Sequence, residues 1–208
     1  MITLRRYTHA CITVDVDGVS LVVDPGEFGT IPDLSTVAAV LITHDHFDHA
    51  HHAAIRAAVE TNPNLQVIGP QSVANSLDVP VTVVDGGDIV DVCGVQVEVY
   101  GHIQAVTSLN DPVIQNVGYL IANTVYHPGD ALHELDCDVL CLPMEVPWAK
   151  NVDRELALRR HPVQRIIPIH DGTLNEVGVQ FAMHNAELLA KECGATVLPL
   201  RDGDSTKL

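Results

Sequence analysis

The sequence is poor in basic residues, in aromatic residues and in long apolar runs. It has 11 Lys and Arg residues against 27 Asp and Glu residues in a chain of 208, a formal net charge of −16. A surface of this charge repels phosphodiester backbones, so nucleic acid is not an expected partner. The longest apolar runs, such as Val37–Ile42, are far shorter than the roughly 20 residues that a membrane-spanning helix needs, so no membrane association is expected.

The five cysteines show no disulfide framework. Their number is odd, and only Cys137 and Cys141 lie close together in the sequence. Such thiols are expected to be buried or free, as in a reducing compartment. The N-terminus also lacks the apolar stretch of a signal peptide, and together these features predict a cytoplasmic protein. No pattern decides whether it forms a homo-oligomer.

The apolar segments predict two strand-rich halves, each closed by helices. Strands are expected at Ile2–Thr8, Cys11–Val16 and Val19–Val23, with Asp17-Gly18 as the turn of a tight hairpin. A second series of strands follows, and the helices are expected at 50–60, 71–77, 152–160 and 176–192. This order predicts an α/β fold with two sheets face to face and helices outside, a four-layer αββα sandwich built as a single domain over 1–208. A mixed α/β layer fold would give a similar order of elements.

Histidine is abundant, and it is clustered. Of the 12 histidines, three fall in the six residues His44-Asp45-His46-Phe47-Asp48-His49, between an apolar strand and the helix at 50–60. In an extended segment residues two apart point the same way, so His44 and His46 can bind one metal ion. Asp48 and His49, at the turn into the helix, can reach a second ion. A solvated polar loop is the alternative interpretation.

One loop cannot supply the ligands of two ions, so later strand ends should contribute. His102, Asp130 and His170 each follow an apolar strand. Taken singly, each could be an ordinary surface or loop residue; together they complete a ligand set at a surface crevice. A mixed His/Asp set suits Zn, Mn or Fe. The remaining histidines without such a placement are not expected to take part: His9, His51, His52, His133, His161 and His184.

The motif His44-x-His46-x-Asp48-His49, followed by a later His, a Gly-Asp pair and a terminal His, resembles the metallo-β-lactamase superfamily. The segments Asn116–Tyr119, Tyr126–Asp130 and Ile167–His170 are similar to its branch of small metal-dependent hydrolases related to the L-ascorbate-6-phosphate lactonases. The resemblance implies the αββα fold and two bound divalent metal ions, with zinc the first choice.

The resemblance also implies which residues bind each ion. His44, His46 and His102 would hold one ion, Asp48, His49 and His170 the other, and Asp130 would bridge the two. The sequence departs from the pattern after His102, because Ile103–Ser108 contains no further histidine.

A metal pair of this kind predicts hydrolysis. Divalent ions lower the pKa of a bound water to about 7 and so supply a hydroxide nucleophile. Asp48 or Asp130 can orient that hydroxide and transfer its proton. His127 can donate to substrate or support a ligand, or it can have a packing role.

The expected protein is a dinuclear metal-dependent hydrolase that cleaves an ester or lactone, an amide or a phosphodiester in a small anionic molecule. The alternatives are an RNA- or DNA-processing nuclease of the same fold and a non-catalytic metal-binding sensor or interaction protein.

Overall fold

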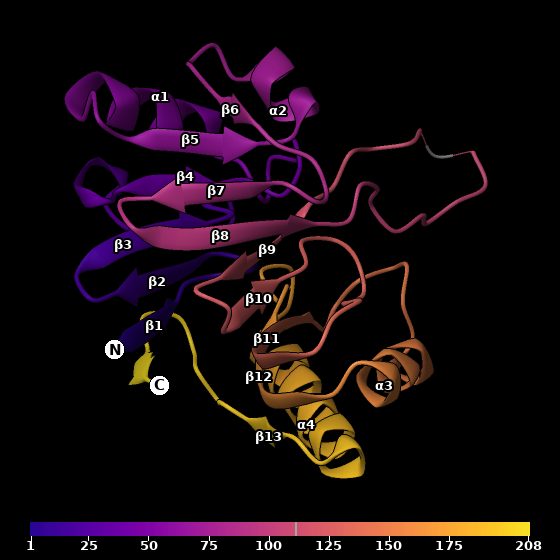
Figure 1. Cartoon of the computed structure of the whole chain (residues 1–208). Helices are drawn as coiled ribbons and strands as arrows, with labels where there is room; N and C mark the ends of the chain where they lie inside the picture. Colours follow the sequence, from indigo (N-terminus) through magenta and orange to yellow (C-terminus); the bar gives the residue numbers. More distant parts are fainter. Residues whose placement is uncertain (111) are drawn as a thin grey trace.

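The computed structural model describes residues 1–110 and 112–208, and within them two seven-stranded sheets pack face to face (Figure 1). The first sheet has the order β14-β1-β2-β3-β4-β5-β6. Its strands are β1 (Ile2–Arg6), β2 (Ile12–Val16), β3 (Val19–Val23), β4 (Ala39–Leu41), β5 (Gln66–Gly69), β6 (Thr82–Val83) and β14 (Ser205–Lys207). The second sheet has the order β13-β12-β11-β10-β9-β8-β7. Its strands are β7 (Ile89–Val92), β8 (Val95–Tyr100), β9 (Gly118–Ile121), β10 (Val125–His127), β11 (Cys137–Pro143), β12 (Val163–Ile169) and β13 (Thr196–Val197).

The central strands are apolar on both faces, because one face of each sheet packs against the other sheet and the opposite face packs against helices. In β4, Leu41 lies in the core between the sheets, whereas Val40 lies in the outer core beneath the helices. In β11, Cys141 faces the other sheet and Leu140 faces the helices. Successive side chains of a strand point to opposite faces, so an unbroken apolar run is what a strand buried on both sides requires.

The helices form the two outer layers. α1 (His52–Thr61) and α2 (Gln71–Ser76) cover the first sheet, and α3 (Asn151–Arg160) and α4 (Glu176–Cys193) cover the second (Figure 1). A short 3-10 helix, η1 (Leu34–Thr36), precedes β4. The predicted αββα sandwich is therefore confirmed. Within the described residues, no helix combines the length and the apolar character needed to cross a membrane.

The turns follow the sequence signals closely. Asp17 and Gly18, with φ of 51° and 91°, form the predicted turn between β2 and β3. Positive φ at both central residues matches the twist of the paired strands. β14 was not expected from the sequence, because its three residues are polar and show no apolar alternation. It pairs antiparallel with β1, with Thr3 opposite Lys207, and brings the chain termini together (Figure 1).

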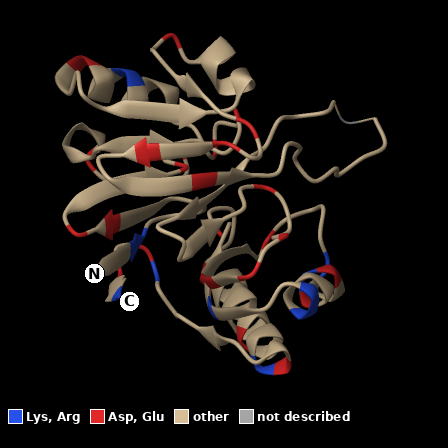
Figure 2. Ribbon diagram, in the orientation of Figure 1, with Lys and Arg blue, Asp and Glu red and all other residues tan. Residues whose placement is uncertain are grey.

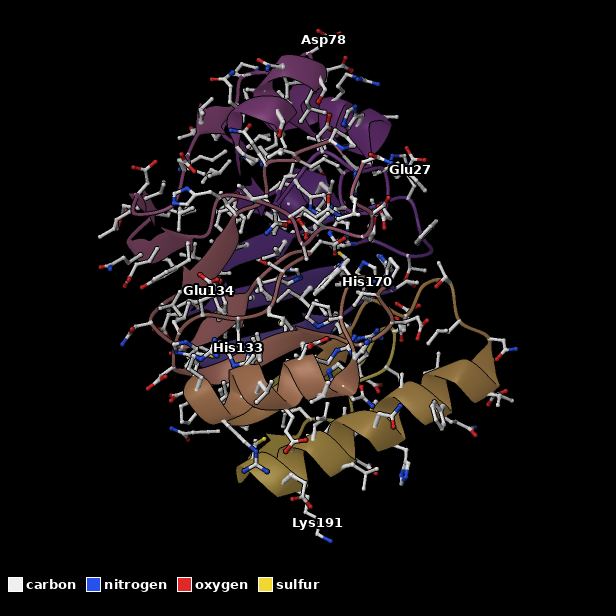
Figure 3. All side chains as sticks on the ribbon, turned by 90° about the vertical axis from the view of Figure 1, so that its right-hand side faces the viewer. Glu27, Asp78, His133, Glu134, His170 and Lys191 are labelled. Carbon is white, nitrogen blue, oxygen red and sulfur yellow. The ribbon has the colours of Figure 1, made fainter. Side chains whose placement is uncertain are left out.

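One edge of the sandwich collects the loops that carry polar side chains. β10, β11 and β12 run parallel, so their C-terminal ends meet at the same edge. The segment after β4 and the loop between β1 and β2 reach this edge from the first sheet. Figure 3 looks onto it and shows His170 near the middle, with α3 and α4 below. Ligands of open α/β sheets commonly bind at such strand ends.

Candidate metal centre

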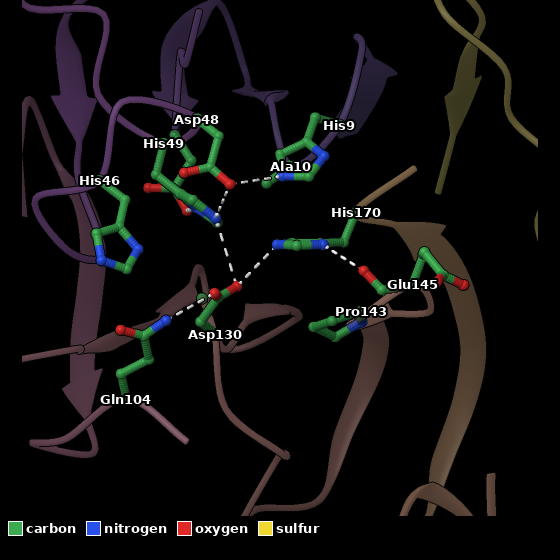
Figure 4. A network of polar contacts seen from close by, with 12 residues as sticks. His9, Ala10, His46, Asp48, His49, Gln104, Asp130, Pro143, Glu145 and His170 are labelled. Atoms are coloured by element: carbon green, nitrogen blue, oxygen red, sulfur yellow. Dashed lines mark hydrogen bonds and ion pairs between the residues drawn. The ribbon is translucent and has the colours of Figure 1, made fainter. Parts of the chain in front are cut away.

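Side chains from both sheets converge on Asp130 (Figure 4). His49 lies in the loop between β4 and α1, Asp130 follows β10, and His170 follows β12. Oδ1 of Asp130 lies 3.1 Å from Nε2 of His170 and 3.4 Å from Nε2 of His49. Nε2 of His49 is in turn 3.8 Å from Oδ2 of Asp48. We call these four residues the His170 half of the site.

The other carboxylate oxygen of Asp130 faces a second group. Oδ2 lies 3.8 Å from Nε2 of His44 and accepts a 3.0 Å hydrogen bond from Nε2 of Gln104. Nδ1 of His46 lies 3.1 Å from Nε2 of His44. We call His44, His46, Gln104 and Oδ2 of Asp130 the His44 half. Asp130 thus stands between two groups of donor atoms, as expected of a bridging residue.

In the His170 half, hydrogen bonds at the Nδ1 atoms of the two histidines orient their Nε2 atoms toward Asp130. Nδ1 of His170 donates to the backbone carbonyl of Glu145 at 2.7 Å, and Nδ1 of His49 donates to Oδ2 of Asp24 at 2.7 Å. A neutral ring then presents an unprotonated Nε2. Both Nε2 atoms, and Oδ1 of Asp130, are buried without a hydrogen-bond partner among the described residues.

Such unpartnered atoms are costly unless a cation lies among them. Two ligand atoms about 2.0–2.2 Å from one ion, at angles of roughly 90–110°, lie about 3.0–3.5 Å apart. The 3.1 Å and 3.4 Å separations around Oδ1 of Asp130 fall in this range. The residues present therefore fit a divalent metal ion.

Asp24, immediately after β3, organises both halves although no sequence pattern pointed to it. Its fully buried carboxylate accepts from the backbone N–H and the hydroxyl of Thr43, at 2.8 Å and 2.7 Å, as well as from His49. Because the Thr43 hydroxyl donates its proton to Asp24, it accepts from Nδ1 of His44 at 2.9 Å. The Nε2 atoms of His44 and His49 are thereby both directed at Asp130.

The electrostatics of the site favour a positive charge near His49. Burial by itself lowers the pKa of His49, but Asp24 and Asp130 outweigh it and hold that pKa well above its ordinary value. Burial raises the pKa of Asp130, and the nearby charges of His49 and His170 overcome this and hold that pKa below its usual range. Burial and the neighbouring His49 lower the pKa of His44 to about 3. His44 is therefore neutral near pH 7, the form that binds metals.

His9, which was expected to have no role, lies inside the site. It is 1% exposed, and its Nδ1 accepts from the backbone N–H of Gly172 at 3.0 Å. The ring proton is therefore on Nε2, which donates to Oδ2 of Asp48 at 3.2 Å. His9 orients a ligand and does not itself present a free lone pair. It comes from the loop between β1 and β2, so its place depends on the contact between the sheets, which no local motif reveals.

The structure does not bring His102 to the cluster. Its ring is 62% exposed, and Nδ1 pairs with Oδ1 of Asp85 at 2.7 Å. Gly101, at φ 72°, turns the chain at the end of β8, and the residue that reaches Asp130 is Gln104. The expectation that His102 holds an ion with His44 and His46 does not fit this placement.

His127 is placed behind the site and not in it. Its side chain is fully buried, Nε2 donates to the carbonyl of Ala10 at 2.8 Å, and Nδ1 accepts from the N–H of Gly129 at 3.2 Å. Both nitrogens are used, and neither faces a space that a substrate could enter. Of the roles expected for His127, this placement fits packing and support of a ligand and not donation to substrate, because His127 holds the turn that presents Asp130.

Comparisons with known proteins show the family and the fold of this chain. The family described as "Beta-lactamase superfamily domain" matches residues 3–170. Protein Rv0786c of Mycobacterium tuberculosis is 31% identical over 175 residues, which cover 80% of this chain and 82% of that protein. A UPF0173 metal-dependent hydrolase of Pyrobaculum neutrophilum is 29% identical over 197 residues, covering 82% of this chain and 84% of the relative. The structure of Igni18, a metallo hydrolase from Ignicoccus hospitalis, is similar with a TM-score of 0.73 at 17% identity, covering 100% of this chain and 99% of the other. The chain belongs to the metallo-β-lactamase superfamily.

Proposed function

We propose that this chain is a metal-dependent hydrolase whose buried His/Asp cluster binds divalent cations, zinc being the first choice, and activates water. The observation that carries the proposal is the convergence of Nε2 of His49, Nε2 of His170 and Oδ1 of Asp130, all buried and all without a hydrogen-bond partner among the described residues. Relatives of similar length are named metal-dependent hydrolases, which supports the same conclusion.

A bound divalent ion supplies a water acidic enough to yield hydroxide near neutral pH. The residues of the His170 half would hold that ion, and those of the His44 half would hold a second. Asp24 and the carbonyl of Glu145 accept from Nδ1 of His49 and His170, so each ring in its neutral form would offer Nε2 to the ion. Asp48 accepts from Nε2–H of His9, and its carboxylate can orient the attacking water and accept its proton.

The proposed substrate is a small anionic molecule with an ester, lactone, amide or phosphodiester bond. The segments Asn116–Tyr119, Tyr126–Asp130 and Ile167–His170, which resemble those of the L-ascorbate-6-phosphate lactonases, favour a lactone or a related ester. Figure 2 shows Asp and Glu spread over many loops and strands, whereas the few Lys and Arg residues are scattered over α1, α3, the C-terminal end of α4 and the region of β1 and the chain termini. This distribution disfavours a long nucleic acid and leaves the metal charge as the attraction for a small anion.

The test is a hydrolysis screen over lactones, phosphodiesters and amides with metal-loaded protein, together with metal analysis. His49→Ala should lose both the bound metal and the activity, whereas His184→Ala, which changes an exposed residue of α4, should keep both. Bound metal without hydrolysis of any class would favour a non-catalytic sensor. Cleavage confined to RNA or DNA would favour the nuclease alternative.

A further inference from the structure

The two halves of the site differ in the ligands that this chain supplies. The His170 half contains two carboxylates, Asp48 and Asp130, and two histidines whose Nδ1 atoms are fixed by hydrogen bonds. The His44 half shares only Oδ2 of Asp130. Nδ1 of His44 is fixed by the Thr43 hydroxyl at 2.9 Å, whereas His46 is only half-buried and its Nδ1 lies 3.1 Å from Nε2 of His44. Fewer negative charges and fewer fixed donors mean weaker cation binding.

The third position of the His44 half is occupied by an amide. Gln104 contacts Oδ2 of Asp130 at 3.0 Å, on the side that faces His44. Two backbone hydrogen bonds hold the segment there, from Gln104 N to the carbonyl of Ile114 at 2.9 Å and from Ala105 N to the carbonyl of Asp130 at 2.8 Å. Gln104 therefore belongs to the site by backbone placement as well as by its side chain.

His102 cannot take this position without rebuilding the loop. Its ring packs over Gly86, where an added Cβ would come within 2.7 Å of the ring, and it pairs with Asp85. Turning the ring toward Asp130 would break that pair and change the chain direction set by Gly101. A neutral amide is a poorer ligand than imidazole for Zn²⁺, which is bound in proteins mostly by Cys, His and carboxylates.

We infer that the two metal sites of this chain are unequal: the His170 half holds one divalent ion tightly, and the His44 half holds a second only weakly because Gln104 stands where a third histidine would be needed. This inference rests on the proposed metal-binding function and sharpens it. The second ion should bind at least about 100-fold more weakly than the first, since the loss of even an outer partner of a ligand costs about 10–100-fold in affinity.

The experiment measures zinc stoichiometry on the full chain. Protein stripped with a chelator is reloaded with excess Zn²⁺ and dialysed against zinc-free buffer, and metal per chain is measured by mass spectrometry. Isothermal titration with Zn²⁺ gives the two affinities, and Co²⁺ substitution gives an absorption spectrum that reports the ligand set. We expect about one ion per chain after dialysis and a second, weaker binding event in the titration.

Three variants connect the stoichiometry to named residues. Gln104→His should raise the retained zinc to about two ions per chain and change the Co²⁺ spectrum. Gln104→Glu, which adds a carboxylate of the same length, should strengthen the second event and serves if the first variant folds poorly. His102→Ala is the matched control from the same segment and should leave stoichiometry and both affinities unchanged.

The outcomes separate the inference from the proposed function. Two ions retained by the unchanged chain, with one lost in His102→Ala, would overturn the inference and leave the metal function standing. A folded Gln104→His and a folded Gln104→Glu that both bind the second ion no better would also overturn it. No retained metal and no titration signal in the unchanged chain would refute the metal-binding function itself.

Discussion

The ring of His9 lies against the ring of His170, with the ring centroids 3.9 Å apart and the ring planes tilted by 47°. The backbones are joined as well, because the N–H of His170 donates to the carbonyl of His9 at 2.9 Å. Both residues have positive φ, 65° and 69°, a conformation that is uncommon for residues other than glycine. This pair ties a loop of the first sheet to the end of a strand of the second. Because His9 also donates to Asp48, the pair keeps His170 close to Asp48.

Replacing His9 should weaken metal binding without abolishing it. His9→Asn keeps a residue that tolerates positive φ but is too short to donate to Asp48. Because an outer partner of a ligand is lost and the ligands remain, Zn²⁺ affinity should fall by about 10–100-fold. Competition with a chromophoric chelator measures this change. His184→Ala, at an exposed position, is the control, and an affinity in His9→Asn equal to that of the control would show that His9 does not orient the site.

Asp24 is expected to matter for stability as well as for the site. Asp24→Ala leaves the N–H and hydroxyl of Thr43 and Nδ1 of His49 without their acceptor in a fully buried place. The free energy of unfolding should fall by about 3 kcal/mol or more, as buried donors lose a charged partner. Urea unfolding of the metal-free protein measures this loss.

Asp24→Asn provides the comparison for that experiment. Asn tolerates the φ of 49° at this position and retains one acceptor oxygen, so its loss of stability should be smaller. Metal affinity should still fall, because the amide holds the tautomer of His49 less firmly. Equal stability of Asp24→Ala and the unchanged chain would contradict the role given to Asp24.

Removing the metal should lower the melting temperature. Binding to the folded state alone stabilises it by about 2.7 kcal/mol when free metal is present at 100 times its dissociation constant. For a chain of this size that corresponds to a decrease of roughly 5–10 °C on chelation. Differential scanning calorimetry with and without a chelator gives the value, and His49→Ala should show no such difference. If the chelator does not change the melting temperature of the unchanged chain, the result would count against tight metal binding.

Stability should decrease in mild acid through His133, which lies beside α3 (Figure 3). Its ring is 2% exposed, Nε2 donates to the carbonyl of His161 at 3.0 Å, and Nδ1 is buried with no partner among the described residues. Burial lowers the pKa of His133 below its ordinary value, so the unfolded chain binds this proton more readily than the folded one. The stability that the neutral, buried His133 contributes is present above about pH 6.5, and it is lost as the pH falls from there toward the lowered pKa.

The measurement is urea unfolding between pH 7.5 and pH 5 for the unchanged chain and for His133→Gln. Glutamine keeps a donor for the carbonyl of His161 but does not titrate. The unchanged chain should therefore lose up to about 1 kcal/mol more than the variant over this range. If the free energy of unfolding changes with pH equally in the two proteins, His133 does not set the pH dependence.

The layers of the fold could be predicted because each one leaves a local pattern. Runs such as Val37–Ile42 require a strand covered on both faces, and Asp17-Gly18 suits the turn that the structure contains. The C-terminal strand β14 could not be predicted, because its polar residues form a strand only by pairing with β1 at the edge of the sheet. The expectation of one domain over 1–208 remains a prediction, although a single core joins the two sheets.

The sequence alone determined which loop carries the ligands, because the spacing of imidazoles and carboxylates within His44–His49 is a local pattern. Tertiary structure decided the rest of the site. Only folding brings His9 to Asp48 and Asp24 to His49, and only the turn at Gly101 decides that Gln104, and not His102, faces Asp130. The physical reason is that hydrogen bonds between residues far apart in the chain depend on how two sheets pack, whereas a sequence motif records only the geometry of its own few residues.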